Sequence, residues 1–143
     1  MPSGANISIP ASEQARFKSW INSVSKETRA NVQNAVEASV YDLRRRAVQF
    51  APHDKGFLKA KSYQRLSSDR LSGEVGFMVH YAPYQEFGTG SMVKVSSDVK
   101  EFAMQFKGKG IRRVNMRPHP FLLPSLRMAS RQLIHRINKL GFR

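Results

Sequence analysis

Residues 25–52 read SKETRANVQNAVEASVYDLRRRAVQFAP, and this stretch decides the fold. Its apolar residues recur at steps of three and four, which is the spacing of one face of an α-helix. They are Val32, Val36, Val40, Leu43, Ala47 and Phe50. The stripe ends at Pro52, because proline restricts the residue before it to extended backbone angles. We therefore expect one long helix over residues 25–50 with a single buried stripe.

A shorter helix is expected before the long one and a turn after it. Ser12 can cap the short helix, and Phe17, Trp20 and Ile21 stand at helical spacing to form its apolar side. Residues 51–56 are typical of a turn, since proline fixes one backbone angle and Gly56 permits angles that other residues avoid.

The period of the sequence changes after this turn. Residues 58–66 and 73–81 favour two strands joined by the polar stretch 67–72. In the second strand the apolar residues alternate: Val75, Phe77, Val79 and Tyr81. This pattern predicts a hairpin with one buried face. A third strand is expected over residues 111–116.

The remaining segments alternate between turns and helices. Residues 81–90 form a tight turn or helical turn that closes on Gly88 and Gly90, and a long loop follows over 91–110. A short helix over 97–106 is an even alternative inside this loop. Prolines break the backbone before a last helix over 121–140. Its apolar stripe is Leu126, Ala129, Leu133, Ile137 and Leu140.

The order of these elements predicts an α+β fold, with long helices packed on one face of a small antiparallel sheet. We expect a flexible N-terminus over residues 1–10 and a single domain over 11–143, with the long loop at 91–110. A small sheet has two open edges, and a loop of this length is unusual in a compact domain. Both features are typical of a subunit that its neighbour completes.

Charge is the strongest signal in the composition. The 143 residues include 24 Lys and Arg against 10 Asp and Glu, a formal net charge of +14. From residue 91 onward there are 12 basic residues and two acidic ones, Asp98 and Glu101. Such an excess indicates contact with polyanions. We expect no export signal and no membrane association, because no apolar stretch approaches the roughly 20 residues that span a bilayer.

The basic residues of the last helix form a row. Arg127, Arg131, His135 and Lys139 recur every four residues, so they lie along one slowly turning side of the helix. The sequence leaves two roles equally open for this row, a face toward DNA or a docking face toward another subunit. The run Arg44, Arg45 and Arg46 fans around the long helix, which is typical of a solvated surface.

No pattern of residues predicts catalysis, a metal or a cofactor. The four histidines, His53, His80, His119 and His135, lack ligand spacing, and the absence of cysteine excludes a thiolate site. There is no Gly-x-Ser-x-Gly motif. The segment Gly88-Thr89-Gly90 lacks the Lys-Ser or Lys-Thr pair of a phosphate loop. A tight structural turn, in which the backbone needs positive torsion angles, is the better interpretation. We expect a protein that is not an enzyme.

Four segments together resemble the minor tail component, or neck, proteins of long-tailed bacteriophages. They are Ala51-Pro52-His53-Asp54-Lys55-Gly56-Phe57-Leu58, Val75-Gly76-Phe77, Tyr81-Ala82-Pro83-Tyr84-Gln85-Glu86-Phe87-Gly88-Thr89-Gly90 and Arg117-Pro118-His119-Pro120-Phe121-Leu122. The resemblance covers about residues 25–140. The family often has Asp-Thr-Gly where this chain has Asp54-Lys55-Gly56, and a small residue in place of Phe57.

The resemblance implies a structural virion protein, assembled in the host cytoplasm, that forms a neck or tail-completion ring around the DNA channel. Its implied partners are copies of itself, six or twelve to a ring, the head-closure or connector proteins, the tail-terminator or tube proteins, and passing double-stranded DNA read without sequence specificity. The turn residues of the motifs are Pro52, Gly56, Glu86, Gly88, Gly90, Pro118 and Pro120. No catalytic residue is transferred.

Two further expectations complete the analysis. Glu86 offers one fixed carboxylate in a chain short of them, and we expect its partner to be an arginine of the same or a neighbouring subunit. The alternative function, carried by the same net charge of +14, is a non-specific DNA-binding accessory protein. A small hydrolase is the weakest reading, since it lacks a catalytic set.

Overall fold

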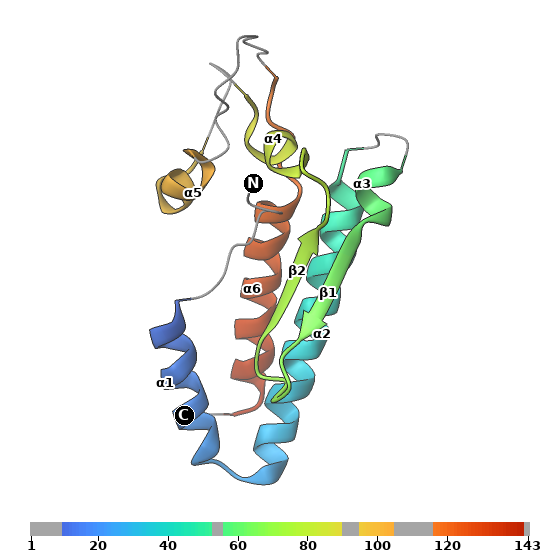
Figure 1. The fold of residues 1–143 in the computed structure, drawn as a ribbon. Coiled ribbons are helices and arrows are strands. Elements are labelled where there is room, and N and C mark those ends of the chain that lie inside the picture. The colour runs from blue at the N-terminus through green and yellow to red at the C-terminus, as the bar shows by residue number, and fades with distance from the viewer. Residues whose placement is uncertain (1–9, 53–55, 90–94, 105–115, 142–143) are drawn as a thin grey trace.

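The computed structural model describes residues 10–52, 56–89, 95–104 and 116–141. They form one small, mostly helical domain with a two-stranded antiparallel sheet (Figure 1). The expected α+β class is therefore confirmed. The expectation of a flexible N-terminus concerns residues 1–10, of which 1–9 lie outside the described residues.

The chain begins with two helices, α1 (Ala11–Asn22) and α2 (Lys26–Phe50). The Ser25 side chain caps α2 by accepting the Thr28 backbone N–H at 3.2 Å. The expected cap at Ser12 is wrong, because α1 starts at Ala11 and Ser12 lies inside its first turn. Pro10 is at the N-cap position, and no side chain caps the helix.

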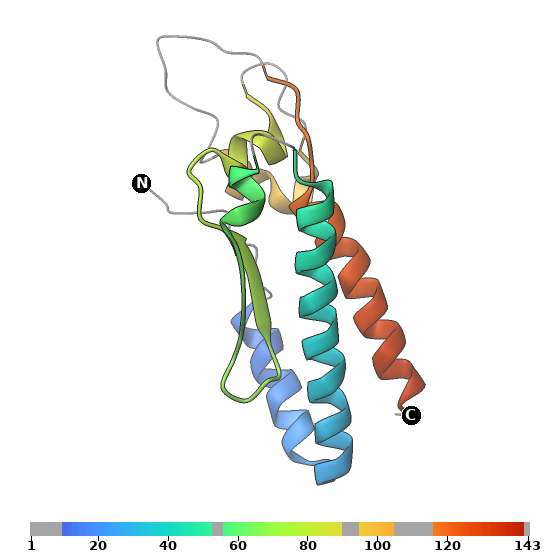
Figure 2. The same ribbon diagram turned by 90° about the vertical axis from the view of Figure 1, so that its right-hand side faces the viewer.

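Helix α2 is the central element. The hairpin of β1 (Ser62–Leu66) and β2 (Gly73–Phe77) lies on one side of it, and α6 (Leu122–Lys139) lies on the other, antiparallel to α2 (Figure 2). The order is therefore hairpin, α2, α6. Helix α2 alone covers most of one face of the sheet, whereas both long helices were expected to cover it.

The two strands are shorter than expected. Residues 57–60 form a short helix, α3 (Phe57–Ala60), because Gly56 turns the chain with a φ of 73° and its carbonyl accepts the Ala60 N–H. The register pairs Ser62 with Phe77 and Leu66 with Gly73. Since β1 starts only at Ser62, the paired register ends at Phe77, and one further hydrogen bond follows it, from the Met78 N–H to the Lys61 carbonyl at 3.0 Å.

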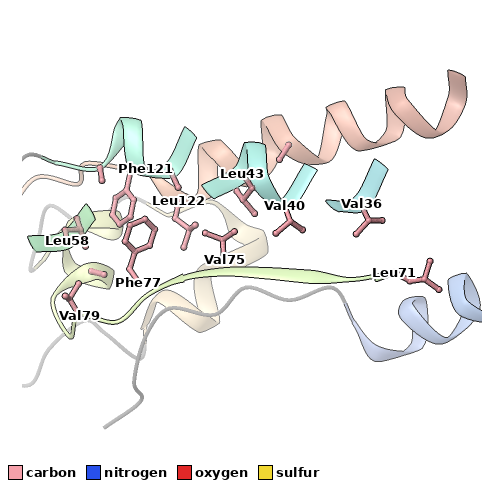
Figure 3. Packing of buried hydrophobic residues seen from close by; sticks show 14 of the residues in the cluster. Val36, Val40, Leu43, Leu58, Leu71, Val75, Phe77, Val79, Phe121 and Leu122 are labelled. Atoms are coloured by element: carbon pink, nitrogen blue, oxygen red, sulfur yellow. The ribbon is translucent and has the colours of Figure 1, made fainter. Parts of the chain in front are cut away.

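The expected burial pattern of β2 nevertheless continues past its end. Val75, Phe77 and Val79 are all buried. They belong to the same core cluster as Val36, Val40 and Leu43 of α2. In Figure 3, Val75 lies close to Val40 and Leu43, Phe77 lies against Phe121, and Val79 lies near Leu58. The α2 stripe is confirmed from Val32 to Ala47. Phe50 is an exception: it is 47 % exposed, on the last turn of the helix.

The turn between the strands is closed by a carboxylate. Asp69 accepts the Leu71 N–H at 3.0 Å and the Ser67 hydroxyl, and it pairs with Lys18 of α1 at 3.2 Å. The Ser67 hydroxyl is the main cause that lowers the pKa of Asp69 from 3.8 to about 2. One side chain thus fastens both the hairpin tip and the first helix.

The segment expected as a long loop contains helix. Helix α4 (Ala82–Phe87) precedes Gly88, and within the expected loop 91–110 a 3-10 turn, η2 (Ser97–Val99), runs into α5 (Lys100–Met104). The alternative of a helix inside the loop is confirmed up to Met104. The expected third strand cannot be placed, because residues 111–115 lie outside the described residues.

Helix α6 has the expected extent but a narrower buried face. Ala129 of the expected stripe is buried, and Leu126 and Leu133 pack on the edge of the core. Ile137 is half-buried, and Leu140 is 37 % exposed just beyond the end of the helix. The buried contacts of α6 are therefore concentrated in its N-terminal half.

Candidate functional site

The best-defined polar site of the molecule is the carboxylate of Glu86. Its Oε2 accepts the backbone N–H groups of Phe121 at 2.8 Å and Leu122 at 2.9 Å, and its Oε1 accepts that of Leu123 at 2.8 Å. Glu86 is only 4 % exposed. A helix leaves its first N–H groups without partners, and Glu86 supplies them for α6 from a different element.

Within the described part of the chain, the partners of Glu86 are backbone N–H groups and not the expected arginine of the same subunit. Among the described residues Glu86 forms no ion pair, and the positive end of the α6 dipole takes the place of the cation. Three N–H donors satisfy a buried carboxylate as well as a guanidinium would. The N-cap residue of α6, Phe121, has no side-chain cap of its own, which explains why the chain needs Glu86 there.

The neighbouring glycine lets two distant segments meet. Gly88 has a φ of 77° and a ψ of −176°, a backbone conformation that is essentially restricted to glycine. A Cβ atom there would lie 2.7 Å from the Met116 carbonyl oxygen. The Thr89 N–H donates to the Met116 carbonyl at 3.0 Å, and the Met116 N–H donates to the Thr89 hydroxyl oxygen at 2.9 Å. The expected positive torsion at Gly88 is confirmed.

A third contact completes this joint between α4 and the start of α6. The His119 N–H donates to the Gln85 carbonyl at 2.7 Å. Pro118 lies against Gly88, at 3.0 Å from where a Cβ would be, and Pro120 is exposed just before Phe121. The segment 116–120 therefore runs alongside α4 before α6 begins.

The other motif segments reach the same end of the molecule. The Phe121 ring, 1 % exposed, packs edge-on against Phe77 with centroids 4.9 Å apart. Leu58 and Ala51, from the turn after α2, are buried in the same core cluster. We call the residues that meet here, Ala51, Leu58, Phe77, Glu86, Gly88 and Phe121, the Glu86 joint. Gly90 and residues 53–55 of the motifs lie outside the described residues.

Helix α5 is attached to this joint by a small second cluster. Phe87, Val99 and Ala103 are buried together, and Phe102 and Leu123 pack against them. The Phe87 and Phe102 rings are 6.3 Å apart. Part of the expected loop is therefore held by apolar contacts within the chain itself.

The basic row of α6 lies opposite the buried face of the helix. Arg127, Arg131, His135 and Lys139 are all exposed. Arg127 differs from the rest, because its Nη2 lies 2.8 Å from Ser96 Oγ and 3.4 Å from Asp98 Oδ2. The Ser96 hydroxyl and Arg127 lower the pKa of Asp98 below its ordinary value. Sequence spacing alone grouped the four residues, and the structure separates one of them.

Polar contacts across the two long helices were not predicted from the sequence. Arg136 donates to Asp42 at 2.6 Å and to Ser39 at 2.8 Å, which ties α6 to α2. The Arg136 hydrogen bond lowers the pKa of Asp42. The spacing signal that could have located Arg136 is its position two turns after the buried Ala129 and one turn after the partly buried Leu133, on the inner side of α6.

Neither a reaction nor a metal is supported by the described parts of the chain. Within them no group of three or more His, Asp or Glu side chains could hold a metal ion. An open depression of about 420 Å³ on α2 holds no nucleophile paired with a base; it is lined by Asn34, Glu37, Ala38, Tyr41, Asp42, Gln64 and Arg136. Among the helices searched, none is long and apolar enough to cross a membrane.

Comparison with known proteins found no match to this chain among protein-family models, curated proteins or solved structures.

Proposed function

We propose that this chain is a structural virion protein of a tailed bacteriophage, a subunit of a neck or tail-completion ring that joins the head connector to the tail around the DNA channel. The proposed partners are copies of the same chain, head-closure or connector proteins, tail-terminator or tube proteins, and the passing duplex. In this role the protein acts through its contacts with neighbouring proteins and DNA, and it catalyses no reaction.

The observation that carries the proposal is the convergence of the motif segments at the Glu86 joint. The segments that resemble the neck family are scattered over the sequence, yet Glu86, Gly88 and Phe121 bring three of them into direct contact. Residues that recur together because of shared ancestry are expected to form one structural unit, whereas chance matches have no reason to meet. The joint thus supports the resemblance on physical grounds.

The test is deletion of the gene from the phage genome that carries it, followed by electron microscopy of the lysate. The expected result is filled heads and complete tails that do not join, and the parent protein supplied from a plasmid should restore joining. The Glu74→Gln variant is a matched control that should restore joining equally, because Glu74 makes only an exposed pair with Arg65 at 3.5 Å. Normal infectious particles in the deletion lysate would refute the proposed role.

A second candidate function is a free, non-specific DNA-binding accessory protein. The exposed cations of α6 and the net charge of +14 favour it. The two candidates differ in assembly: a free binder holds duplex DNA tightly at low salt as a monomer or dimer, whereas a neck subunit binds it weakly and assembles on partner rings. Sedimentation of the purified chain with and without duplex DNA separates them.

A further inference from the structure

The basic row of α6 divides into two parts. Each step of four residues turns about 40° around the helix axis, so the row winds from the α5 side at Arg127 to the α2 side at Lys139. Arg127 is occupied by Ser96 and Asp98. In the described part of the chain, Arg131 and Lys139 form no ion pair. The free positive charge therefore lies on the C-terminal side of the row.

Helix α2 adds cations beside α6. Arg46 reaches across to α6, where its Nη1 lies 3.6 Å from Met128 Sδ, which is only a weak acceptor. Its Nε is buried and has no hydrogen-bond partner in the described residues. Arg45 is 56 % exposed and shares Asp42 with Arg136. We call the line along which α2 and α6 meet the seam. Arg45 and Arg46 of the run 44–46 both lie beside it.

We call Arg45, Arg46, Arg131, His135 and Lys139 the seam face. Arg44 is not part of it, since it turns to the opposite side and donates to the Ser62 carbonyl and hydroxyl at 3.3 Å. Two carboxylates line the depression on α2 next to Arg136: Asp42, which pairs with Arg45 and Arg136, and Glu37, which pairs with Arg70. The face is left with a surplus of long cationic side chains.

The composition of the seam face favours a nucleic-acid backbone over a protein surface. The centre of a protein–protein interface is poor in charged residues, whereas charged side chains predominate along this part of α2 and α6. One exposed aromatic residue, Tyr41, lies one turn before Arg45 and lines the depression with Asp42 and Arg136. Interfaces with DNA are much more positive. Duplex DNA presents one negative charge per about 1.7 Å of its length, a density that a protein surface does not match.

We infer that the seam face binds the phosphate backbone of duplex DNA, without reading its sequence. The inference rests on the proposed function in that the passing duplex is the ligand. It assigns Arg131, His135 and Lys139 of the basic row to DNA. It excludes Arg127 from DNA binding, because this residue holds the η2–α5 segment against α6. Contacts to phosphates alone carry no sequence information, which suits a surface past which DNA must slide.

The test compares two double variants of the full chain that remove equal charge. Binding to a fluorescently labelled duplex of arbitrary sequence is measured between 50 and 200 mM salt. Arg131→Gln with Lys139→Gln removes two seam cations that are exposed and unpaired, so folding should be unchanged by circular dichroism. Arg127→Gln with Lys100→Gln removes two exposed cations outside the seam face.

The expected result is a smaller salt dependence in the seam variant only. Each lost phosphate contact lowers the slope of log K against log salt by about 0.9, so two lost contacts reduce the change in affinity across this salt range by about 12-fold. A second control uses polyglutamate in place of DNA. The inference is overturned if the seam variant keeps the parent slope, if both variants lose slope equally, or if the seam variant loses only polyglutamate binding, which would assign the face to an acidic protein.

The DNA-binding experiment and the particle test have separate outcomes. An unchanged slope in a protein that is still required to join heads and tails would overturn the seam face and leave the neck role standing. A reduced slope in the seam variant, together with normal particles in the deletion lysate, would overturn the neck role and leave the seam face standing.

Discussion

Replacing Glu86 with glutamine should destabilise the domain by about 2–4 kcal/mol. The carboxylate accepts two N–H groups on Oε2 and one on Oε1, and an amide keeps only one acceptor oxygen. If the amide oxygen takes the Oε2 position, the Leu123 N–H faces a second donor. The variant then loses one hydrogen bond to a charged group, worth about 1.5–3 kcal/mol, and the interaction of the charge with the helix dipole, worth about 0.3–2 kcal/mol.

The assay is urea unfolding of the purified chain followed by far-ultraviolet circular dichroism. A loss of this size is a large part of the roughly 5–15 kcal/mol that stabilises a typical domain, so the transition midpoint should fall clearly while its slope stays constant. The control is Glu74→Gln, which removes the same charge from an exposed pair and should change the free energy of unfolding by less than about 0.5 kcal/mol.

A second variant, Glu86→Asp, separates the charge from the reach of the side chain. It keeps the carboxylate but withdraws it by about 1.5 Å, so the contacts of 2.8–2.9 Å to the α6 backbone are broken. We expect it to be at least as unstable as Glu86→Gln. If Glu86→Gln unfolds within about 0.5 kcal/mol of the parent, Glu86 does not cap α6 in solution and the reasoning is refuted.

Three other substitutions test separate parts of the fold. Gly88→Ala should cost about 1–3 kcal/mol from backbone strain alone, with a further cost from the Cβ that would meet the Met116 carbonyl at 2.7 Å; a thermal melt equal to that of the parent would contradict this. Asp69→Asn should lower the melting temperature at neutral pH. Because the folded-state pKa of Asp69 is depressed from 3.8 to about 2, its stabilisation is present above pH 3.8 and is lost as the pH falls toward 2, so the parent and the variant should converge in that window. A constant difference across these pH values would count against the hydrogen-bonded carboxylate. Arg136→Gln should cost about 1–3 kcal/mol in urea unfolding, since it leaves Asp42 without its 2.6 Å partner, and an unchanged midpoint would show that the contact adds nothing.

Most of the helical structure could be predicted from local patterns. The apolar stripe from Val32 to Ala47 identifies α2 and its buried face, and the expected start at residue 25 is within one residue of the observed start at Lys26. The stripe around Ala129 identifies α6 in the same way. These predictions succeed because a helix is stabilised by contacts within one stretch of chain and by burial of one continuous face.

The boundaries that failed depend on neighbours in space. The first strand was expected from residue 58, but Gly56 supports a turn of helix there, and the paired register therefore ends at Phe77. Phe50 fits the α2 stripe by spacing, yet it is 47 % exposed, whereas Ala47 and Ala51 on either side of it are buried. Periodicity reports which face a residue is on, and it does not report whether anything packs on that face.

The sequence by itself determined the α+β class, the long helices, the positive torsion at Gly88 and the excess of positive charge. Only the tertiary structure decided what these features contact. Glu86 meets the start of α6 some 35 residues away, and Arg127 is held by Asp98 while Arg46 reaches Met128. The physical reason is that a helix pattern is encoded within a few turns of chain, whereas the partner of a charge is set by the packing of the whole domain, which brings different segments within hydrogen-bond distance.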